Sequence, residues 1–384
     1  MIDRDDAKVL DAADQLSRWR EEFVIPDPEL IYLDGNSLGR TPKRTVAALH
    51  RLVEQQWAGD LIDSWWEHDW LNLALNVGDE LAPLLGASAG EVAVHESTTV
   101  SIFQQVNVAL DLEPNRRVIA IDAADFPTDR YVAEGVARLR DGEVRLGFDD
   151  LQGVDVVLRS LVDYRTAEIA DMRGETRRAA DAGATTIWDL SHAAGVLDLD
   201  LHAAGVELAV GCTYKFLNGG PGSPAFVFVS ERVQDSVIQP VWGWFAQSDQ
   251  FAMERPFSPR QGIGRMRNGT PPVLGLTATR EGIALTVEAG IADIAAKAVR
   301  LTGFGIKLAD QFGLETITPR DPDLRGGHVA VRHPDAVVLH DALGARKIVV
   351  DRRDPDVLRF GLSPLTTRYV DVYDAFLALA DIVK

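Results

Sequence analysis

The 384-residue chain contains a single cysteine, Cys212. One cysteine excludes an intramolecular disulfide and a cysteine-rich metal site, so we expect a reducing compartment and no bound metal. Positive charge is also scarce, because 39 Lys and Arg residues face 58 Asp and Glu residues and leave a formal net charge of −19. This balance opposes binding to nucleic acid or to an anionic membrane surface. Any anionic ligand therefore needs a local site.

Long apolar runs and a basic leader are missing too. The first residues, MIDRDDAKVLDAADQLSRW, begin without a positive cluster, and no apolar run approaches the ~18 residues of a membrane span. We therefore expect a cytoplasmic protein without a membrane partner. With 46% apolar and 25% charged residues, the composition is typical of a globular enzyme-sized chain with room for two domains.

Short apolar runs alternate with helical stretches through the middle of the chain. Helical spacing is found at 130–140 and 168–182, between several of the strand-like runs. The strand-like runs are 117–121, 154–158, 185–189, 206–210 and 225–229. Apolar strands that alternate with helices predict an α/β fold with a mostly parallel sheet covered on both faces.

The two ends of the chain have a different pattern. Residues 5–22 and 43–58 are predicted to be helical, and a long helical run from residue 273 precedes the strand-like HVAVRH, KIVVDRRD and VLRFGLS. This order favours a smaller α+β domain after the large one. The predicted division is an N-terminal segment associated with the small domain (1–45), a large cofactor-binding domain (46–275) and a small C-terminal domain (276–384).

Lysine is rare, and Lys215 is the only one between Lys43 and Lys297. Arginine stays protonated near neutral pH, whereas an ε-amine can lose its proton and form a Schiff base. The surrounding stretch, GCTYKFLNGGPGS, places the lysine before the glycines, which is the reverse of the phosphate-binding G-x-x-x-x-G-K-[ST] loop, and no G-x-G-x-x-G occurs. A Schiff-base lysine is one interpretation, and a surface lysine is the other.

Asp189 and His192, in ATTIWDLSHAAG, directly follow a strand-like run. Ligands of open α/β sheets bind outside the carboxyl ends of the strands, so an acid at this place suits a site. If the cofactor is pyridoxal phosphate, a buried aspartate pairs with the pyridine nitrogen and keeps it protonated. A helix cap and a packed histidine explain the two residues equally well when each is considered alone. Their combination with Lys215 favours the cofactor interpretation.

A phosphate group requires its own pocket, and HESTTVSIF offers one. Ser97, Thr98 and Thr99 begin a probable helix, where free N–H groups, hydroxyls and the helix dipole favour an anion, although such residues also serve as ordinary caps. The later DFPTDRY contributes Phe126, which is suited to stacking on a flat ring or to a core position, and Asp129. The order of phosphate site, stacking aromatic, ring-nitrogen acid and Schiff-base lysine is the strongest signal in the sequence.

These residues resemble those of the kynureninase family, which has the fold-type I aminotransferase-like fold. The resemblance covers nearly the whole chain through YLDGNSLGRTPK, STTVSIF, DFPTDRY, WDLSHAAG, GCTYKFLNGGPGSPAFVFV, GWF, NGTPP and RFGLSPL. It implies a seven-stranded-type sheet in the large domain, pyridoxal 5'-phosphate as cofactor and a homodimer. The lysine loop is the most specific of these motifs.

The resemblance also implies roles for individual residues. Lys215 would form the Schiff base, Asp189 would bind the ring nitrogen and Phe126 would stack on the ring. Further residues would surround the cofactor: Thr98, Thr99, Asp129, Ser160, His192 and Tyr214. Trp244 and Thr270 would reach the cofactor phosphate from the partner subunit, and Arg359 would hold the substrate α-carboxylate as a planar fork.

The implied reaction is hydrolysis of L-kynurenine, or of its 3-hydroxy form, to anthranilate or 3-hydroxyanthranilate and L-alanine in tryptophan catabolism. Tyr214 would supply a proton to the carbon released by the bond cleavage. Trp65, Trp66 and His68 either line the aryl pocket or belong to the core or an interface. The chain departs from the family pattern at four positions, which could alter the substrate pocket: Asp163, Ala167, Ala246 and Gln247.

Three other functions compete with this prediction. A cysteine desulfurase would share the fold, but it needs a nucleophilic cysteine on a mobile loop, and Cys212 lies only three residues before Lys215. An aminotransferase needs the same lysine, aspartate and arginine, and only its products separate it from a hydrolase. A noncatalytic ligand-binding module is disfavoured because Lys215, Asp189 and Arg359 are all present.

Overall fold

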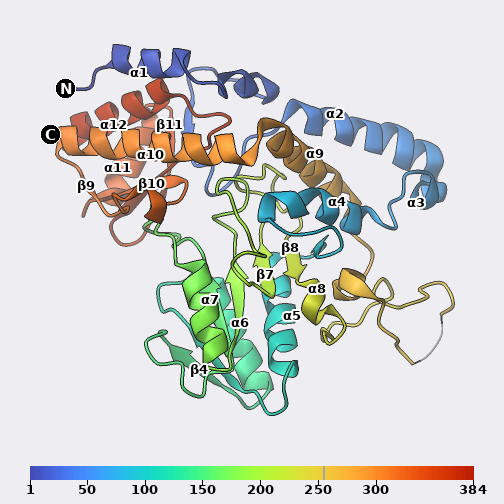
Figure 1. The fold of residues 1–384 in the computed structure, drawn as a ribbon. Coiled ribbons are helices and arrows are strands. Elements are labelled where there is room, and N and C mark those ends of the chain that lie inside the picture. The colour runs from blue at the N-terminus through green and yellow to red at the C-terminus, as the bar shows by residue number, and fades with distance from the viewer. Residues whose placement is uncertain (254–255) are drawn as a thin grey trace.

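The computed structural model describes residues 1–253 and 256–384, which form two β-sheets and their covering helices (Figure 1). One sheet has seven strands in the order β2-β8-β7-β6-β5-β3-β4, and the other has five in the order β1-β11-β12-β10-β9. The strands of the seven-stranded sheet are β2 (Val92–Val94), β3 (Val118–Ile121), β4 (Glu143–Leu146), β5 (Val156–Ser160), β6 (Thr185–Asp189), β7 (Leu208–Gly211) and β8 (Phe226–Val229). Those of the five-stranded sheet are β1 (Ile31–Leu33), β9 (Glu315–Thr316), β10 (His328–Arg332), β11 (Ile348–Arg353) and β12 (Val357–Gly361).

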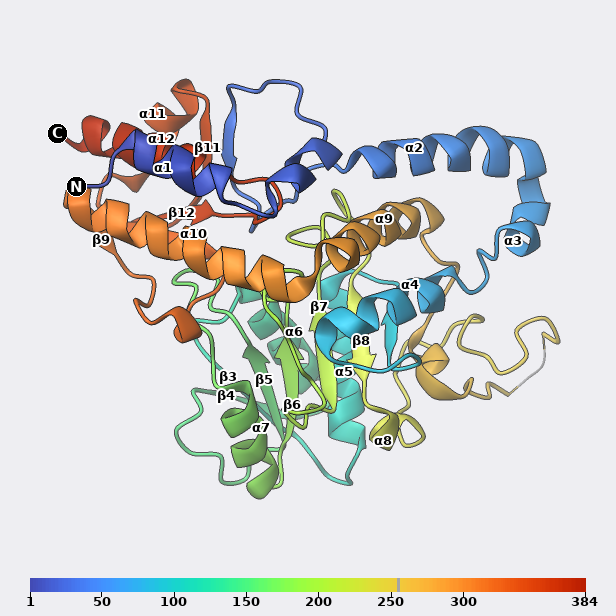
Figure 2. The same cartoon turned by 45° about the horizontal axis from the view of Figure 1, so that its top comes forward.

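Helices pack on both faces of the seven-stranded sheet. The helices of the chain are α1 (Arg4–Ala12), α2 (Lys43–Arg51), α3 (Ser64–Glu67), α4 (Leu73–Leu81), α5 (Thr98–Asp111), α6 (Pro127–Leu139), α7 (Met172–Asp181), α8 (Glu231–Gln234), α9 (Val273–Ala289), α10 (Ile291–Phe312), α11 (Ala336–Ala345) and α12 (Tyr369–Val383). Helices α5 and α6 share one core with Ile187 of β6, whereas α4 and α9 share another with Trp188 of the same strand. Figure 2 shows the sheet between these two layers. None of the helices in the described part of the chain is long and apolar enough to cross a membrane.

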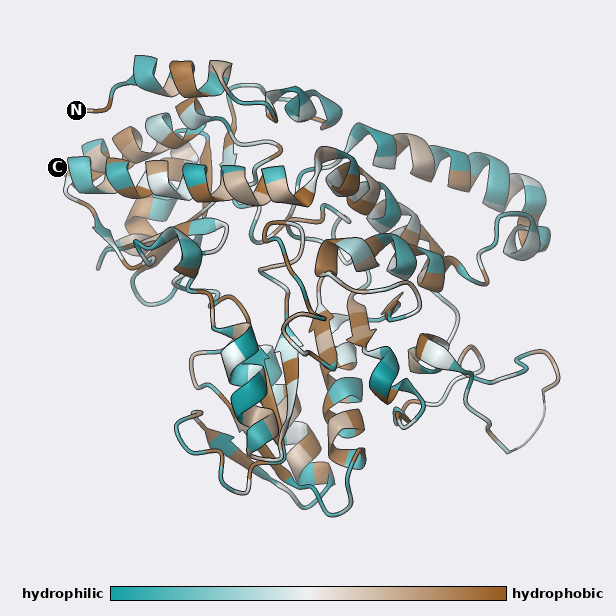
Figure 3. Cartoon of the chain, viewed as in Figure 1, coloured by the Kyte–Doolittle hydropathy of each residue, from teal (hydrophilic) through white to brown (hydrophobic). Residues whose placement is uncertain are grey.

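The seven-stranded sheet is mostly parallel, which confirms the predicted α/β fold. Only β8 runs opposite to its two neighbours, β2 and β7. The strands β6, β7 and β8 are buried at every position, and β7 and β8 are hydrophobic over nearly their whole length in Figure 3. A strand covered on both faces is expected to be continuously apolar, because both sets of alternating side chains leave water.

The five-stranded sheet joins the two ends of the chain. Strand β1 pairs in parallel with β11, so that Ile31 lies opposite Ile348, and β11, β12, β10 and β9 then follow in antiparallel pairs. Residues of α10, α11 and α12 cover the sheet in one apolar core. The residue boundaries predicted for the domains remain predictions, although the pairing of β1 with β11 brings the N-terminal segment into this sheet.

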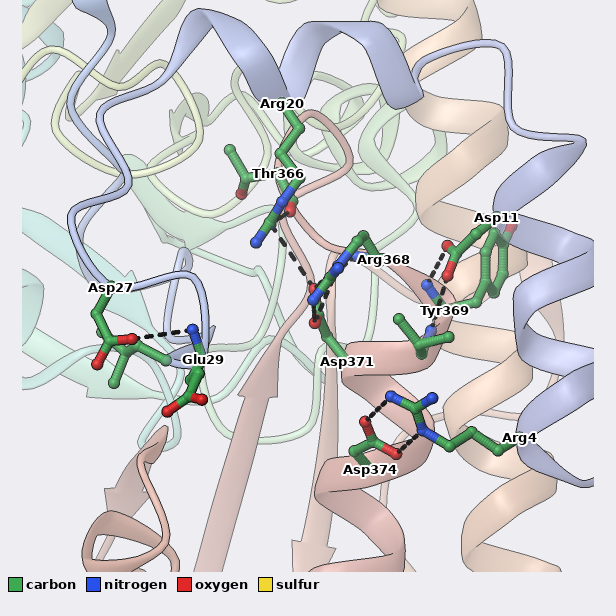
Figure 4. A network of polar contacts seen from close by, with 12 residues as sticks. Arg4, Asp11, Arg20, Asp27, Glu29, Thr366, Arg368, Tyr369, Asp371 and Asp374 are labelled. Atoms are coloured by element: carbon green, nitrogen blue, oxygen red, sulfur yellow. Dashed lines mark hydrogen bonds and ion pairs between the residues drawn. The ribbon is translucent and has the colours of Figure 1, made fainter.

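Polar contacts hold the N-terminal segment on α12 (Figure 4). Asp11 accepts hydrogen bonds from the backbone N–H groups of Tyr369 (2.7 Å) and Val370 (3.1 Å), which are first-turn donors of α12 that lack a partner within the helix. Arg4 forms a two-pronged ion pair with Asp374 at 2.8 Å. A helix from the start of the chain therefore supplies the cap for the helix at its end.

The helices differ from the prediction at two places. Residues 5–22 were expected to form one helix, but α1 ends at Ala12 because Asp14 accepts from the N–H of Leu16 and binds the buried Lys297 at 2.6 Å. Such local side-chain contacts compete with helical hydrogen bonds. The long helical run from residue 273 is divided at Gly290, whose φ of 86° favours glycine.

Candidate active site

A cavity of about 200 Å³ lies between the two sheets. Its residues follow the carboxyl ends of β2, β3, β6 and β7, where open α/β sheets bind their ligands, and they also follow β1 and β11 of the other sheet. The lining residues are Asn36, Ser37, Thr98, Thr99, Phe126, Thr128, Asp129, Asp189, Ser191, His192, Tyr214, Lys215 and Arg353. Eight of the twelve residues predicted for the site therefore lie around one cavity.

Lys215 lies in the turn after β7, and its Nζ is 3.3 Å from Nδ1 of His192. Burial, followed by the positive charge of Lys215, lowers the pKa of His192 well below its ordinary value. His192 is therefore neutral and can accept a hydrogen bond from the amine. The ring centroid of Tyr214 lies 5.8 Å from the same Nζ. The histidine thus holds the lysine side chain within the cavity without adding a second charge.

Asp189 ends β6 and is 7% exposed. One carboxylate oxygen, Oδ1, accepts a hydrogen bond of 2.9 Å from the backbone N–H of Ser191. The contact fixes the carboxylate at the strand end, where it lines the same cavity as Lys215. Asp189 is thus a buried carboxyl group at the edge of the cavity.

A second carboxyl group, that of Asp129 in the first turn of α6, is even more deeply buried. Its Oδ2 has no hydrogen-bond partner among the described residues, and the residue is 1% exposed. Burial raises the pKa of Asp129 well above its ordinary value, and the neighbouring carboxyls of Asp189 and Asp125 raise it further. Ser160, at the end of β5 and paired in register with Asp189, lies beside this group and is not among the cavity-lining residues.

The Asp125→Asn variant is expected to lose less stability than the wild type between pH 5 and pH 8. Burial raises the pKa of Asp125 to about 7 although Arg159 opposes the shift, whereas an aspartate of the unfolded chain titrates near pH ~3.9. The folded state therefore binds this proton more tightly, and the free energy of unfolding falls as the pH rises through this interval. Between pH 5 and pH 8, the free energy of unfolding measured with urea should fall by about 2 kcal/mol more in the wild type than in the variant.

Asp122→Asn is the matched control for this prediction. Asp122 lies 3.2 Å from Arg159, as Asp125 lies 3.5 Å from it, but Asp122 is far less buried. Its replacement should leave the pH dependence of unfolding close to that of the wild type. Equal pH dependence of the Asp125→Asn variant and the wild type would contradict the assignment of a buried, protonated Asp125.

The residues predicted to form an anion site lie at the start of α5. Ser97 is the N-cap, and its hydroxyl accepts from the N–H of Val100 at 3.3 Å. Thr98 and Thr99 are the first residues of this 14-residue helix, and both line the cavity. Their backbone N–H groups and the positive end of the helix dipole favour a phosphate at this place.

Two aromatic residues complete the walls. Phe126 is 36% exposed and packs edge-to-face on Tyr164, with 5.3 Å between the ring centroids. The sequence allowed either a core position or a position beside the cofactor for Phe126. In the structure its side chain lines the cavity. Burial raises the pKa of Tyr214 above its ordinary value, so its hydroxyl stays protonated at neutral pH.

Arg359 of β12 is completely buried behind the cavity wall. Its guanidinium contacts three protein groups: the carboxylate of Asp351, the carbonyl oxygen of Tyr164, and Oγ of Ser37 at 3.3 Å. Ser37 itself lines the cavity, so Arg359 lies directly behind it. The carboxylate-binding arginine that the sequence predicts is therefore paired with an internal carboxylate.

Trp244 and Thr270 lie away from the Lys215 cavity of their own chain. Trp244 packs against Phe245, with 4.7 Å between the ring centroids, and Thr270 lines a groove of about 610 Å³. Trp65 lines the same groove. Of the other aryl-pocket candidates, Trp66 is 58% exposed and His68 pairs with Asp60 at 2.8 Å.

Five cavity residues had no predicted role, namely Asn36, Ser37, Thr128, Ser191 and Arg353. Four of them stand inside or beside motifs that the sequence analysis quoted, such as YLDGNSLGRTPK and DFPTDRY. Arg353 belongs to the strand-like KIVVDRRD, where no pattern separates it from its neighbour Arg352. Only the approach of the two sheets brings it to the cavity.

Comparison with known proteins places these residues in a family. The protein-family model described as the kynureninase C-terminal domain matches residues 294–379. A kynureninase of Pseudomonas fluorescens is 40% identical over 400 residues, which span 100% of this chain and 96% of that protein. The chain belongs to the kynureninase family. A kynureninase of Deinococcus radiodurans is 43% identical and covers 97% of the chain and 95% of its own length.

Solved structures support the fold of this family member. An apo cysteine desulfurase of Thermococcus onnurineus NA1 has a TM-score of 0.81 at 17% identity, over 95% of this chain and 97% of that protein. The cystine C-S lyase C-DES, as a mutant with glycine linked to its PLP cofactor, has a TM-score of 0.82 at 14% identity, over 93% of this chain and 100% of that protein. At such identities the likeness concerns the fold alone.

Membership of the kynureninase family makes the protein a pyridoxal-phosphate-dependent hydrolase. The cavity fits this cofactor chemically. It contains an amine in Lys215, a buried carboxylate in Asp189 and a helix N-terminus with hydroxyls at Thr98 and Thr99. The unpartnered buried Oδ2 of Asp129 is a further acceptor that a bound polar group would satisfy.

Proposed function

We propose that the Lys215 cavity hydrolyses the Cβ–Cγ bond of L-kynurenine and releases anthranilate and L-alanine. Cleavage of kynurenine is the reaction of the family to which the chain belongs. The observation that carries the assignment to this cavity is the convergence of Lys215, Asp189 and the α5 N-terminus on one space. When bound, pyridoxal 5'-phosphate supplies an aldehyde that captures amines and a ring that withdraws electrons from the attached carbon.

The protein residues bind and orient these groups. Thr98 and Thr99 would hold the phosphate, Phe126 would stack on the ring, and Asp189 would keep the ring nitrogen protonated. Ser160 and Asp129 support this end of the site, which is consistent with the burial of both. A fixed carboxylate at the ring nitrogen needs no reorganisation during the reaction, and such preorganisation is a large part of electrostatic catalysis.

Lys215 and Tyr214 move the protons. Lys215, held beside the neutral His192, would be the residue that holds the cofactor aldehyde, and its amine, once displaced by the amino group of the substrate, would accept the proton from the substrate Cα. Tyr214 donates a proton to the carbon that is left after the Cβ–Cγ bond has broken. Its raised pKa suits this role, because the hydroxyl must be protonated before it can donate.

We also propose that the enzyme works in the cytoplasm as a homodimer. Trp244 and Thr270 would then reach the phosphate in the partner subunit's cavity, which agrees with their absence from the lining of the cavity of their own chain. The single cysteine and the net charge of −19 support a reducing, nonmembrane location. Sedimentation of the cofactor-loaded protein tests the dimer, and a monomer with full activity would reject it.

Parallel assays with L-kynurenine and 3-hydroxy-L-kynurenine test the proposed reaction. The purified, cofactor-loaded enzyme should release the fluorescent aryl product from one or both substrates, and the ratio of the two kcat/KM values gives the aryl preference. Absence of turnover with both substrates would reject the assignment of the reaction. A requirement for a keto acid would indicate an aminotransferase instead.

The Arg359→Lys variant is expected to bind L-kynurenine about ten-fold more weakly while it retains the cofactor. An ammonium group cannot reproduce the planar fork that now contacts Asp351, Tyr164 and Ser37. Titration of the visible spectrum with L-kynurenine measures the affinity, and the absorbance without substrate measures cofactor content. An unchanged dissociation constant for L-kynurenine would show that Arg359 does not bind the substrate.

A further inference from the structure

Asn36 is a cavity residue with an unsatisfied side chain. It follows β1, is 0% exposed, and neither Nδ2 nor Oδ1 has a hydrogen-bond partner among the described residues. The side chain fits closely against β12, since a Cβ atom added at Gly361 would lie 1.9 Å from Oδ1. Buried amides are nearly always hydrogen-bonded, so the unpartnered amide of this cavity-lining residue is a point at which a bound ligand would add a hydrogen bond.

Arg353 lies at the end of β11 and lines the same cavity, with about a third of its side chain exposed (32%). Among the described residues it has one ion pair, from Nε to Oδ2 of Asp351 at 2.9 Å, in which the two atoms are close but not aligned for a hydrogen bond. That oxygen is also the partner of Arg359, whose Nε lies 2.6 Å away. One internal carboxylate therefore neutralises two arginines, and the terminal nitrogens of Arg353 remain for a further anion.

Asp189 and Lys215 come from the seven-stranded sheet, whereas Asn36 and Arg353 come from the five-stranded sheet. If residues of the seven-stranded sheet hold the amino group of the substrate, its carboxylate points toward the five-stranded sheet. Guanidinium binds carboxylate through two parallel hydrogen bonds, and an amide N–H₂ group adds a third donor.

We propose that Arg353 forms the cavity-facing part of the substrate carboxylate site, with Asn36 and Arg359 as its inner, buried members. Asp351 is then a positioning residue, because it fixes both guanidinium groups before the substrate arrives. This inference rests on the proposed reaction, since it names the residues that select an α-amino acid for that site. It adds two residues of this chain to the one arginine that the sequence predicted.

The test compares L-kynurenine with kynuramine, which is the same molecule without the carboxylate. In the cofactor-loaded Arg353→Gln variant, KM and the spectroscopic dissociation constant for L-kynurenine should rise about ten- to a hundred-fold, because a charged hydrogen-bond partner is lost. The dissociation constant for kynuramine should change less than about two-fold. Asn36→Ala should raise KM for L-kynurenine about three- to ten-fold, since its lost partner is neutral.

Arg352→Gln is the matched control. Arg352 is the preceding residue of β11, so its side chain leaves the opposite face of the strand, where it pairs with Asp354. This variant should bind both L-kynurenine and kynuramine with the affinity of the wild type. Arg353→Lys, which keeps the charge but loses the fork, should lie between wild type and Arg353→Gln.

Two results would overturn the proposal. One is an unchanged affinity of Arg353→Gln for L-kynurenine, and the other is an equal loss of affinity for both ligands. Binding is read from the cofactor spectrum as well as from turnover. A wild type that binds L-kynurenine without cleaving it would therefore reject the proposed reaction and still decide the role of Arg353.

Discussion

Replacement of Lys215 by alanine is expected to remove the visible absorbance of the purified, cofactor-loaded enzyme and to lower kcat by about 10⁴-fold or more. In the proposed mechanism this variant lacks the amine that would hold the aldehyde and move the Cα proton, and no other lysine lines the cavity among the described residues. Absorbance spectra before and after borohydride treatment measure the first effect. The wild-type band should disappear on reduction, and the variant should lack it from the start.

Lys307→Ala provides the control for general effects of losing a lysine. Lys307 is an exposed residue of α10, and this variant should keep both the band and the turnover of the wild type. A wild type that is fully loaded with cofactor but has no borohydride-sensitive band would contradict the role of Lys215. Normal turnover by Lys215→Ala would contradict it equally.

The Asp189→Asn variant is expected to keep the visible band but to lose about 10²- to 10³-fold in kcat. The amide is nearly the same size as the carboxylate and can still accept the N–H of Ser191, but it has no charge with which to hold a proton on the ring nitrogen. The chemistry therefore slows while Lys215 continues to bind the aldehyde. Steady-state kinetics and the spectrum of the same sample measure both effects.

Asp198→Asn, at an exposed position shortly after the same strand, is the companion variant and should behave like the wild type. The two variants of the site separate two roles, because Lys215→Ala should lose the band and Asp189→Asn should keep it. Full activity of Asp189→Asn would show that the ring nitrogen does not depend on this carboxylate.

The sequence predicts much of the large sheet because its central strands are apolar on both faces. The runs at 185–189, 206–210 and 225–229 correspond to β6, β7 and β8 within two residues. The edge strand β4 has no such signal, since EVRL is exposed or half-buried at every position. Strand β2 is only three residues long. Edge strands and very short strands depend on their neighbours, which a local pattern does not record.

The residues of the site also fall into those that the sequence predicts and those that it does not. Lys215 and Asp189 could be predicted because each lies at or shortly after the end of a strand-like run and has a residue type that the chemistry requires. Arg353 and Asn36 could not, because they reach the cavity from the second sheet, and the distance between the sheets is a property of tertiary packing. The pairing of Arg359 with Asp351 is likewise set by the antiparallel register of β11 and β12, which places Asp351 opposite Arg359.

Product analysis without a keto acid tests the central claim most directly. The cofactor-loaded wild type is incubated with L-kynurenine alone, and anthranilate and L-alanine are both quantified over time. Hydrolytic cleavage in the Lys215 cavity predicts that the two products appear in equal amounts and that the Lys215→Ala variant forms neither. Consumption of L-kynurenine without L-alanine, or only after a keto acid is added, would contradict the account.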